Sequence, residues 1–426
     1  MLGSRRLHPL FPRRNTSRYC KIYFSQPYAR DTARKHSATR CRTSEPLSRP
    51  AGLRKRLCPP HAQPSSFPMV RKIVRRYLIL ARGKFLDDAK TAHGVIAYGQ
   101  DEISAIVDAS LAGKTVRGVL PHLQCDAPIC ESVREGLQYH PTSLLIGVAP
   151  QGGALPQAWR SEILHAMDAK LEIVSGLHEL ISEDEEFAKA ARRSGTEIWD
   201  VRVPPTVPLF SGAVYDVRVP TLLTVGSDCA VGKMTVALEL ARSAQKRGVN
   251  ATFVPTGQTG VLIAGWGICI DRVVSDFAAG AAEQMVLEAA PESELLIVEG
   301  QGSIHHPAYG AVTLALMYGC APDALVLVVD PTARTIANFE VPALGYPELV
   351  TAYEIALAPV KPARVVGIAL KTLGLDARQA RYEIERAREE SQLPCDDVVR
   401  FGADALYDSI ASEVRRTRPR TAAVPA

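Results

Sequence analysis

The sequence lacks a C-x-x-C pair, a secretory hydrophobic segment and any apolar run long enough to cross a membrane. Its longest stretches without Asp, Glu, Lys or Arg are 136–159, 248–270 and 300–322, and each is interrupted by Gly, Pro, Gln or His. A membrane-spanning helix needs about 20 consecutive apolar residues, so none is predicted. The nine cysteines are scattered without zinc-site spacing, which indicates reduced thiols in a cytoplasmic protein.

Acidic residues are nearly absent from the first 68 positions. That segment carries 15 Lys or Arg and two acids, whereas the remaining 358 residues carry 35 basic and 43 acidic side chains. The overall positive charge therefore belongs to one terminal segment and gives no support for nucleic-acid binding by the rest of the chain. The body has the mildly acidic balance that is common among soluble enzymes.

The N-terminal segment, residues 1–68, is rich in Arg, Ser and Pro and has no hydrophobic period, so we expect it to be disordered. Three interpretations are open: an organellar transit peptide, a basic nucleic-acid arm, or upstream sequence translated from a wrong start. We favour the wrong start, because composition and charge change abruptly at Met69, just before an apolar run.

From Met69 onward, short apolar runs alternate with amphipathic stretches, a pattern typical of parallel sheets covered by helices. The Pro-rich stretch 203–208 predicts a domain boundary near residue 210. We therefore expect an α/β protein with a parallel-sheet domain over 69–209 and a doubly wound domain over 210–426. Expected strands are 77–81, 143–148, 171–174, 197–201, 220–225, 251–254, 295–298, 324–329 and 365–369; expected helices are 157–169, 177–193, 232–246, 280–290 and 377–390.

The segment from Gly226 to Thr235 follows an apolar strand and opens a helix, which is the context of a phosphate-binding loop. Backbone N–H groups would hold phosphate oxygens and Lys233 would supply a cation. The alternative without a function is a chance Gly-Lys pair at a strand-to-helix turn. Met234 occupies the position whose hydroxyl usually ligates Mg²⁺, and Thr235, one residue later, is the alternative ligand. Phosphate binding is therefore predicted, and metal-dependent ATP hydrolysis is left open. The expected cofactor-binding residues are Gly226, Ser227, Asp228, Cys229, Ala230, Val231, Gly232, Lys233, Met234 and Thr235.

Three motifs in the second half resemble dethiobiotin synthetase and its relatives. These are the loop Gly226-Ser-Asp-Cys-Ala-Val-Gly-Lys233, the segment Pro255-Thr-Gly-Gln-Thr-Gly260 and the segment Val298-Glu-Gly-Gln-Gly-Ser303. Val254 stands where those enzymes carry a functional Lys. The resemblance implies a shared fold, and an ATP-dependent ligase or kinase using Mg²⁺ is the alternative function.

A closer resemblance covers essentially all of 69–426. It is carried by Lys90-Thr-Ala-His-Gly94, the phosphate loop, Thr256–Gly260, Asp271–Phe277 with Gly280 and Glu283, and Glu299–Pro307. Together these resemble a bacterial family, long of unknown function, that includes D-glutamate or D-amino acid N-acetyltransferases. The resemblance implies a Rossmann-like domain over 69–209 followed by a P-loop NTPase-like, doubly wound domain over 210–426. The resemblance implies acetyl transfer from acetyl-CoA to a small D-amino acid, with the loop holding CoA phosphates in place of a hydrolysable nucleotide.

Acyl transfer to an amine requires a base, because the ammonium must lose a proton before it can attack. The candidate catalytic residues are Asp271, Asp276, Glu299 and His306. Asp271 and Asp276 are otherwise a helix cap or solvated acids, and His305 and His306 are otherwise loop histidines bonded to backbone. Glu299 follows a predicted strand, at the edge where such sheets bind ligands.

In the first half, the expected substrate-binding residues are Lys90, Thr91 and His93, at an interdomain site. The alternative is that they belong to a solvated loop without a binding function. Gln258, Thr259 and Gln301 complete the expected substrate-binding set. Cys229 lies where a helix N-terminus would lower its pKa, so an acetyl-thioester there is weighed against simple packing. We expect a homo-oligomer acting on a small molecule, without nucleic acid, membrane or metal.

Overall fold

The computed structural model describes residues 74–148 and 155–416. The predictions for residues 1–68, including the preferred start at Met69, lie outside the described residues. No helix in the described part is long and apolar enough to cross a bilayer. The six cysteines there are all free thiols.

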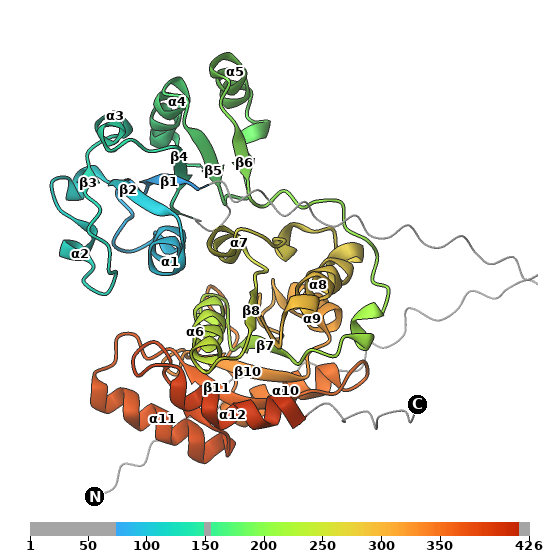
Figure 1. Ribbon diagram of the computed structural model, residues 1–426. Helices are drawn as coiled ribbons and strands as arrows, with labels where there is room; N and C mark the ends of the chain where they lie inside the picture. The colour runs from blue at the N-terminus through green and yellow to red at the C-terminus, as the bar shows by residue number, and fades with distance from the viewer. Residues whose placement is uncertain (1–73, 149–154, 417–426) are drawn as a thin grey trace, which may run out of the picture. The chain divides into compact units, whose positions relative to one another are not determined.

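The first domain is built on a six-stranded parallel sheet with the strand order β3-β2-β1-β4-β5-β6 (Figure 1). This is the order of a Rossmann-like fold, in which the connection reverses direction between β1 and β4. The strands are β1 Arg76–Leu80, β2 Glu102–Val107, β3 Ile129–Cys130, β4 Ser143–Ile146, β5 Glu172–Ser175 and β6 Ile198–Asp200. The helices are α1 Lys90–Tyr98, α2 Val116–Val119, α3 Val133–Gly136, α4 Arg160–Asp168 and α5 Glu185–Ser194.

The second domain contains another six-stranded parallel sheet, ordered β12-β11-β10-β7-β9-β8. Its strands are β7 Thr221–Gly226, β8 Ala251–Val254, β9 Leu295–Val298, β10 Ala324–Val329, β11 Arg364–Leu370 and β12 Cys395–Asp396. Its helices are α6 Lys233–Lys246, α7 Gln258–Ala264, α8 Ser275–Ala289, α9 Gly310–Cys320, α10 Tyr346–Leu357, α11 Ala377–Ser391 and α12 Asp404–Arg416. Short 3₁₀ turns lie at 109–111, 137–139, 157–159, 181–183, 213–216, 270–272 and 290–292. The predicted α/β fold of two parallel-sheet domains is confirmed.

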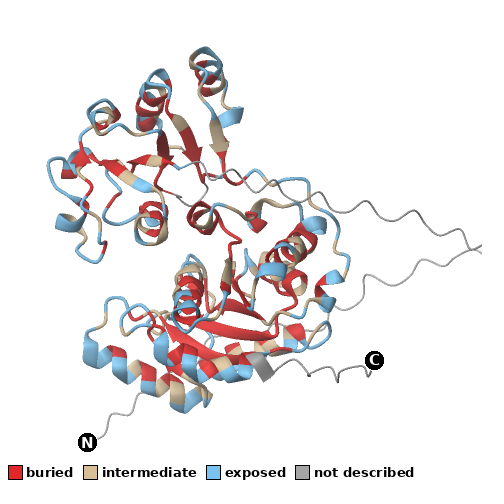
Figure 2. Ribbon diagram, in the orientation of Figure 1, coloured by how far each residue is buried: buried red, intermediate tan, exposed pale blue. Residues whose placement is uncertain are grey.

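The central strands are buried along their whole length, as Figure 2 shows for β7 and β10. Helices cover both faces of a parallel sheet, so side chains on either side of such a strand avoid water. That is why continuous apolar runs, such as Ala324–Val329, predicted nine of the twelve strands in the described residues to within two residues, whereas β2, β3 and β12 were not predicted.

Two predicted helices begin at the wrong residue. The helix expected from 177 starts at Glu185, because the Asp184 carboxylate caps it by accepting the N–H groups of Glu186 and Phe187. The helix expected from Gly280 starts at Ser275. Helix α9 was not predicted at all, since it is apolar on nearly every side and shows no helical period.

The Pro-rich linker packs closely against α8. Gly280 has no side chain where the linker crosses, and a Cβ there would lie 2.0 Å from the carbonyl oxygen of Pro208. One turn later the buried carboxylate of Glu283 accepts the N–H groups of Ser211 and Val214, at 2.6 and 3.1 Å. Gly280 and Glu283 therefore fix the linker to the second domain.

We expect Gly280→Ala to lower the free energy of unfolding. Alanine favours a helix over glycine by about 1 kcal/mol, but overpacking against rigid backbone costs about 1–3 kcal/mol. Chemical denaturation should show a net loss of up to about 2 kcal/mol, whereas Ser275→Ala at the exposed start of the same helix should change stability by less than about 0.5 kcal/mol. A stabilised Gly280→Ala protein would contradict the close packing.

Candidate functional site

The phosphate loop joins β7 to α6. Ala230 and Gly232 adopt left-handed backbone conformations, with φ of 55° and 104°. Such turns direct successive N–H groups toward one point and form a nest for an anion. The first N–H groups of α6 have no intrahelical acceptors and add to the same positive field. The predicted cofactor-binding residues thus form one loop and one helical turn.

Lys233 is the cation of this loop and is only 6% exposed. Its Nζ donates to the main-chain oxygen of Asp228 at 2.7 Å. Burial lowers the pKa of Lys233 to about 8, although the nearby Cys229, Asp228 and Glu299 oppose the shift. An incoming phosphate would compensate this buried charge better than a carbonyl does.

Met234 packs against the first domain. A Cβ added to Gly94 of α1 would lie 3.3 Å from its Cε and 2.6 Å from Thr259 Cγ2. Close by, the hydroxyls of Thr91 and Thr259 are hydrogen-bonded at 3.2 Å. The position that usually supplies a Mg²⁺ ligand is therefore used for packing between α1, α6 and α7.

Glu299, at the end of β9, is 5% exposed and holds the start of α7. Its Oε2 accepts the N–H groups of Thr256 and Gly257 at 2.9 and 3.0 Å. A Cβ on Gly260 would lie 2.3 Å from the same oxygen, so the glycine permits the approach. Burial raises the pKa of Glu299 to about 7, and the charge of Asp271 adds to this effect while Lys233 opposes it.

His306 is 4% exposed, and its hydrogen bonds determine which ring nitrogen of the neutral imidazole carries the proton. Its Nδ1 accepts the N–H groups of Ala308 and Tyr309 at 3.1 and 3.2 Å. A neutral ring therefore carries its proton on Nε2, which lies 3.7 Å from Asp228 Oδ1 at the phosphate loop. The geometry therefore supports a role for His306 as a hydrogen-bond donor rather than as the base that acyl transfer requires.

His305 has the more available ring nitrogen. Its Nδ1 lies 3.1 Å from Ser303 Oγ, while Nε2 is buried and has no partner among the described residues. Burial lowers the pKa of His305, so its neutral form is favoured. The sequence places both histidines in the same loop, but only the fold shows which ring is bonded to backbone.

Asp228, Cys229 and His306 place one possible metal-ligand atom each within 4.8 Å of one another. The donors do not fit a metal ion. Both Asp228 oxygens accept N–H groups, from Cys229 and Ala337, and His306 presents an N–H. Burial raises the pKa of the Cys229 thiol despite the nearby Lys233. The expectation that the helix N-terminus lowers this pKa was wrong, because desolvation outweighs it.

The two predicted catalytic aspartates lie on the segment leading into α8. Asp271 forms an ion pair with the buried Arg202, which also donates to Gly176 O at 2.7 Å, and His178 Nε2 lies 3.8 Å from it. Asp276 is exposed in the first helical turn. Asp271 is near enough for its charge to raise the pKa of Glu299. Among the described residues, no contact joins the Asp276 side chain to the phosphate loop.

The predicted substrate-binding residues do not all come together in one place. Thr91 and Thr259 meet at the contact between α1 and α7. Gln301 Nε2 donates to Thr256 Oγ1 at 3.1 Å, near Glu299. Lys90 is exposed at the start of α1, His93 donates to Phe85 O at 2.6 Å, and Gln258 packs against Gly176.

Two parallel sheets, the second with a phosphate loop after a central strand, define this chain as a two-domain P-loop protein with a Rossmann-like first domain. The profile described as a "DUF1611_N Rossmann-like domain" matches residues 109–204, and the profile described as a "DUF1611_C P-loop domain" matches residues 208–407. The chain belongs to the DUF1611 family.

Two relatives carry the name D-glutamate N-acetyltransferase. The protein of Tritonibacter scottomollicae is 36% identical over 274 residues, covering 63% of this chain and 81% of the relative. The protein of a Pseudoalteromonas species is 34% identical over 291 residues, covering 67% and 85%. The crystal structure of a DUF1611 family protein from Anabaena variabilis is 38% identical, with a TM-score of 0.76 over 79% of this chain and 99% of that one.

The buried Glu299 carboxyl should make stability depend on pH. Its pKa is raised from 4.5 to about 7 in the fold, so the folded state holds the proton more tightly and this contribution is lost as pH rises through that range. Glu299→Gln removes the titration and preserves an oxygen acceptor. Relative to wild type, the variant should gain about 3 kcal/mol between pH 4.5 and pH 8. Urea denaturation across this range measures the difference, and parallel stability curves would refute the raised pKa.

Proposed function

We propose that this protein transfers the acetyl group of acetyl-CoA to the amino group of a small D-amino acid, D-glutamate first among them. The observation that carries the proposal is the similarity to two proteins named D-glutamate N-acetyltransferase across 81% and 85% of their lengths. The two family profiles match parts of both domains, including the phosphate loop, so the family relationship is not confined to a shared nucleotide-binding fold.

The phosphate loop would hold the CoA diphosphate. The nest at Ala230 and Gly232, the first turn of α6 and the buried Lys233 all favour an anion. The Met234 side chain packs against Gly94, and the carboxylates of Glu299 and Asp228 accept N–H groups. The loop therefore has few ligands for a catalytic Mg²⁺. Binding CoA phosphates requires no such ion.

The reaction forms a bond between the amine nitrogen and the thioester carbonyl carbon and breaks the carbon–sulfur bond. The ammonium loses one proton before it attacks. The nitrogen loses a second proton as the amide forms, the departing thiolate takes up one, and one proton in all is released to water. Glu299 has a pKa of about 7, and its bonds to N–H groups all end on Oε2. Its Oε1 would take the ammonium proton. The His306 Nε2–H would donate to an oxygen anion beside the loop.

The remaining features of this proposal come from the sequence. We place the protein in the cytoplasm, acting on a small molecule as a homo-oligomer, without nucleic acid or membrane partners. An ATP-dependent ligase or kinase is the alternative, favoured by one observation: Thr235 lies in the first turn of α6, beside the buried Lys233.

We expect purified protein to release free thiol from acetyl-CoA in the presence of D-glutamate, and Lys233→Ala to lower kcat/KM. A hydrogen bond to a charged group contributes about 1.5–3 kcal/mol, which corresponds to about a 10- to 150-fold loss. Lys246→Ala, at the exposed end of the same helix, is the matched control and should behave as wild type. Absence of turnover by the wild-type protein across D- and L-amino acids would remove the proposed function.

Ligand-induced stabilisation separates acetyl transfer from the ATP-dependent alternative. A ligand raises the melting temperature according to its concentration relative to its Kd. At equal concentrations CoA should therefore raise the melting temperature more than ATP with Mg²⁺. The opposite order, measured by differential scanning fluorimetry, would favour the ligase or kinase.

A further inference from the structure

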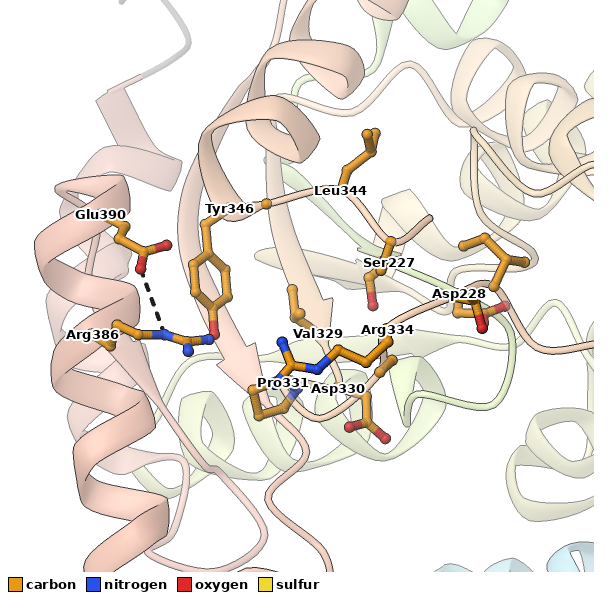
Figure 3. Close-up of a pocket in the computed structure, with 15 residues that line it drawn as sticks. Ser227, Asp228, Val329, Asp330, Pro331, Arg334, Leu344, Tyr346, Arg386 and Glu390 are labelled. Carbon is orange, nitrogen blue, oxygen red and sulfur yellow. Dashed lines mark ion pairs between the residues drawn. The ribbon is translucent and has the colours of Figure 1, made fainter. Parts of the chain in front are cut away.

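A pocket of about 300 Å³ lies beside the phosphate loop (Figure 3). One end is formed by Ser227 and Asp228 of the loop itself. The walls come from the end of β10 and the segment 330–336, from Tyr346 at the start of α10, and from Arg386 of α11. None of the proposed catalytic residues lines it, so it has no assigned role in the acetyl transfer.

Ser227 marks the end of the pocket at the phosphate loop. The residue is 7% exposed, and its Oγ is buried without a hydrogen-bond partner among the described residues. A buried hydroxyl left unpaired costs free energy that a polar ligand atom would recover. The pocket is thus continuous with the loop that holds phosphate and offers a hydrogen bond where the two meet.

Arg334 supplies an uncompensated positive charge. Its side chain has no acidic partner among the described residues, and Figure 3 shows its guanidinium extending from the loop toward Tyr346. Arg386 is paired with Glu383 at 2.8 Å and Glu390 at 3.6 Å, and Asp330 with Lys371 at 3.3 Å. The Asp228 carboxylate, at the loop end of the pocket, accepts the N–H groups of Cys229 and Ala337. Arg334 is therefore the cation of this pocket that is available to an anionic group of a ligand.

The segment that carries Arg334 is attached to the phosphate loop. Asp228 Oδ2 accepts the N–H of Ala337 at 2.7 Å, and Arg334 O accepts the N–H of Ala343 at 2.9 Å. The free guanidinium is thereby held on a segment whose position depends on the loop. A ligand that spans both would meet a preformed arrangement, which lowers the entropy cost of binding.

The remaining walls are apolar and include an aromatic ring. Val329, Ile336 and Tyr346 are 5%, 1% and 4% exposed, and Pro331 lies beside them. Such a surface suits a flat ring system. D-glutamate fits poorly here, because it needs partners for two carboxylates and one ammonium, whereas the pocket offers one unpaired cation.

We infer that this pocket binds the adenosine end of CoA, with Arg334 contacting the 3′-phosphate. The inference rests on the proposed function, since it assigns one end of the acyl donor. The diphosphate in the loop connects to the adenosine, the base lies against the apolar wall, and the 3′-phosphate meets the free guanidinium. That phosphate distinguishes CoA from its 3′-dephospho form and from ATP, so Arg334 is a specificity-determining residue.

The test is titration calorimetry with CoA and 3′-dephospho-CoA, which requires no turnover. Arg334→Gln should raise the Kd of CoA at least tenfold and leave that of 3′-dephospho-CoA unchanged, so that the two ligands bind the variant alike. Arg378→Gln is the matched control, because this exposed arginine of α11 lies outside the pocket and has no ion pair among the described residues. It should alter neither affinity.

Three outcomes would overturn the inference. Equal binding of both ligands by the wild-type protein would show that the 3′-phosphate is not recognised, while thiol release with D-glutamate would still support the proposed function. An Arg334→Gln protein with an unchanged Kd for CoA and a raised KM for D-glutamate would assign the pocket to the acyl acceptor. A wild-type protein that binds neither ligand and releases no thiol would remove the proposed function as well.

Discussion

The carboxylate of Glu299 organises the carboxyl edge of the second sheet. It leaves β9 buried and accepts the N–H groups of Thr256 and Gly257, which start helix α7. That helix brings Thr259 to Thr91 and, with Met234, contacts α1 around Gly94. Through α7, this buried acid links the sheet that carries the phosphate loop to the Rossmann-like domain. Gly260 has no side chain and so permits the close approach of the Glu299 carboxylate.

Burying Glu299 and Lys233 costs desolvation free energy. The same burial changes the pKa values of both groups. Desolvation raises the pKa of Glu299 to about 7 and lowers that of Lys233 to about 8. A carboxyl and an amine with pKa values this close to neutrality can exchange protons under ordinary conditions. The same desolvation keeps Cys229 protonated, which argues against a covalent acetyl-thioester.

Hydrogen bonds from the backbone decide what the side chains around the loop can do. In the possible metal-ligand pair His306 and Asp228, main-chain N–H groups bond to the Nδ1 lone pair of His306 and to each carboxylate oxygen of Asp228. In contrast, Ser227 and Arg334 retain unused hydrogen-bonding capacity in the neighbouring pocket. The backbone bonds therefore leave these two side chains, rather than His306 Nδ1, available to a ligand.

The sequence by itself determined the α/β class, most strands and the phosphate loop, because those features depend on local periodicity and on residues adjacent in the chain. It could not show that Asp271 pairs with Arg202, 69 residues away, nor that His306 Nδ1 is bonded to backbone. It also gave no signal for Arg334, which lines the pocket and forms no ion pair among the described residues. Only the tertiary structure decides such features, because hydrogen-bond partners, burial and uncompensated charge are properties of distant segments brought together in space.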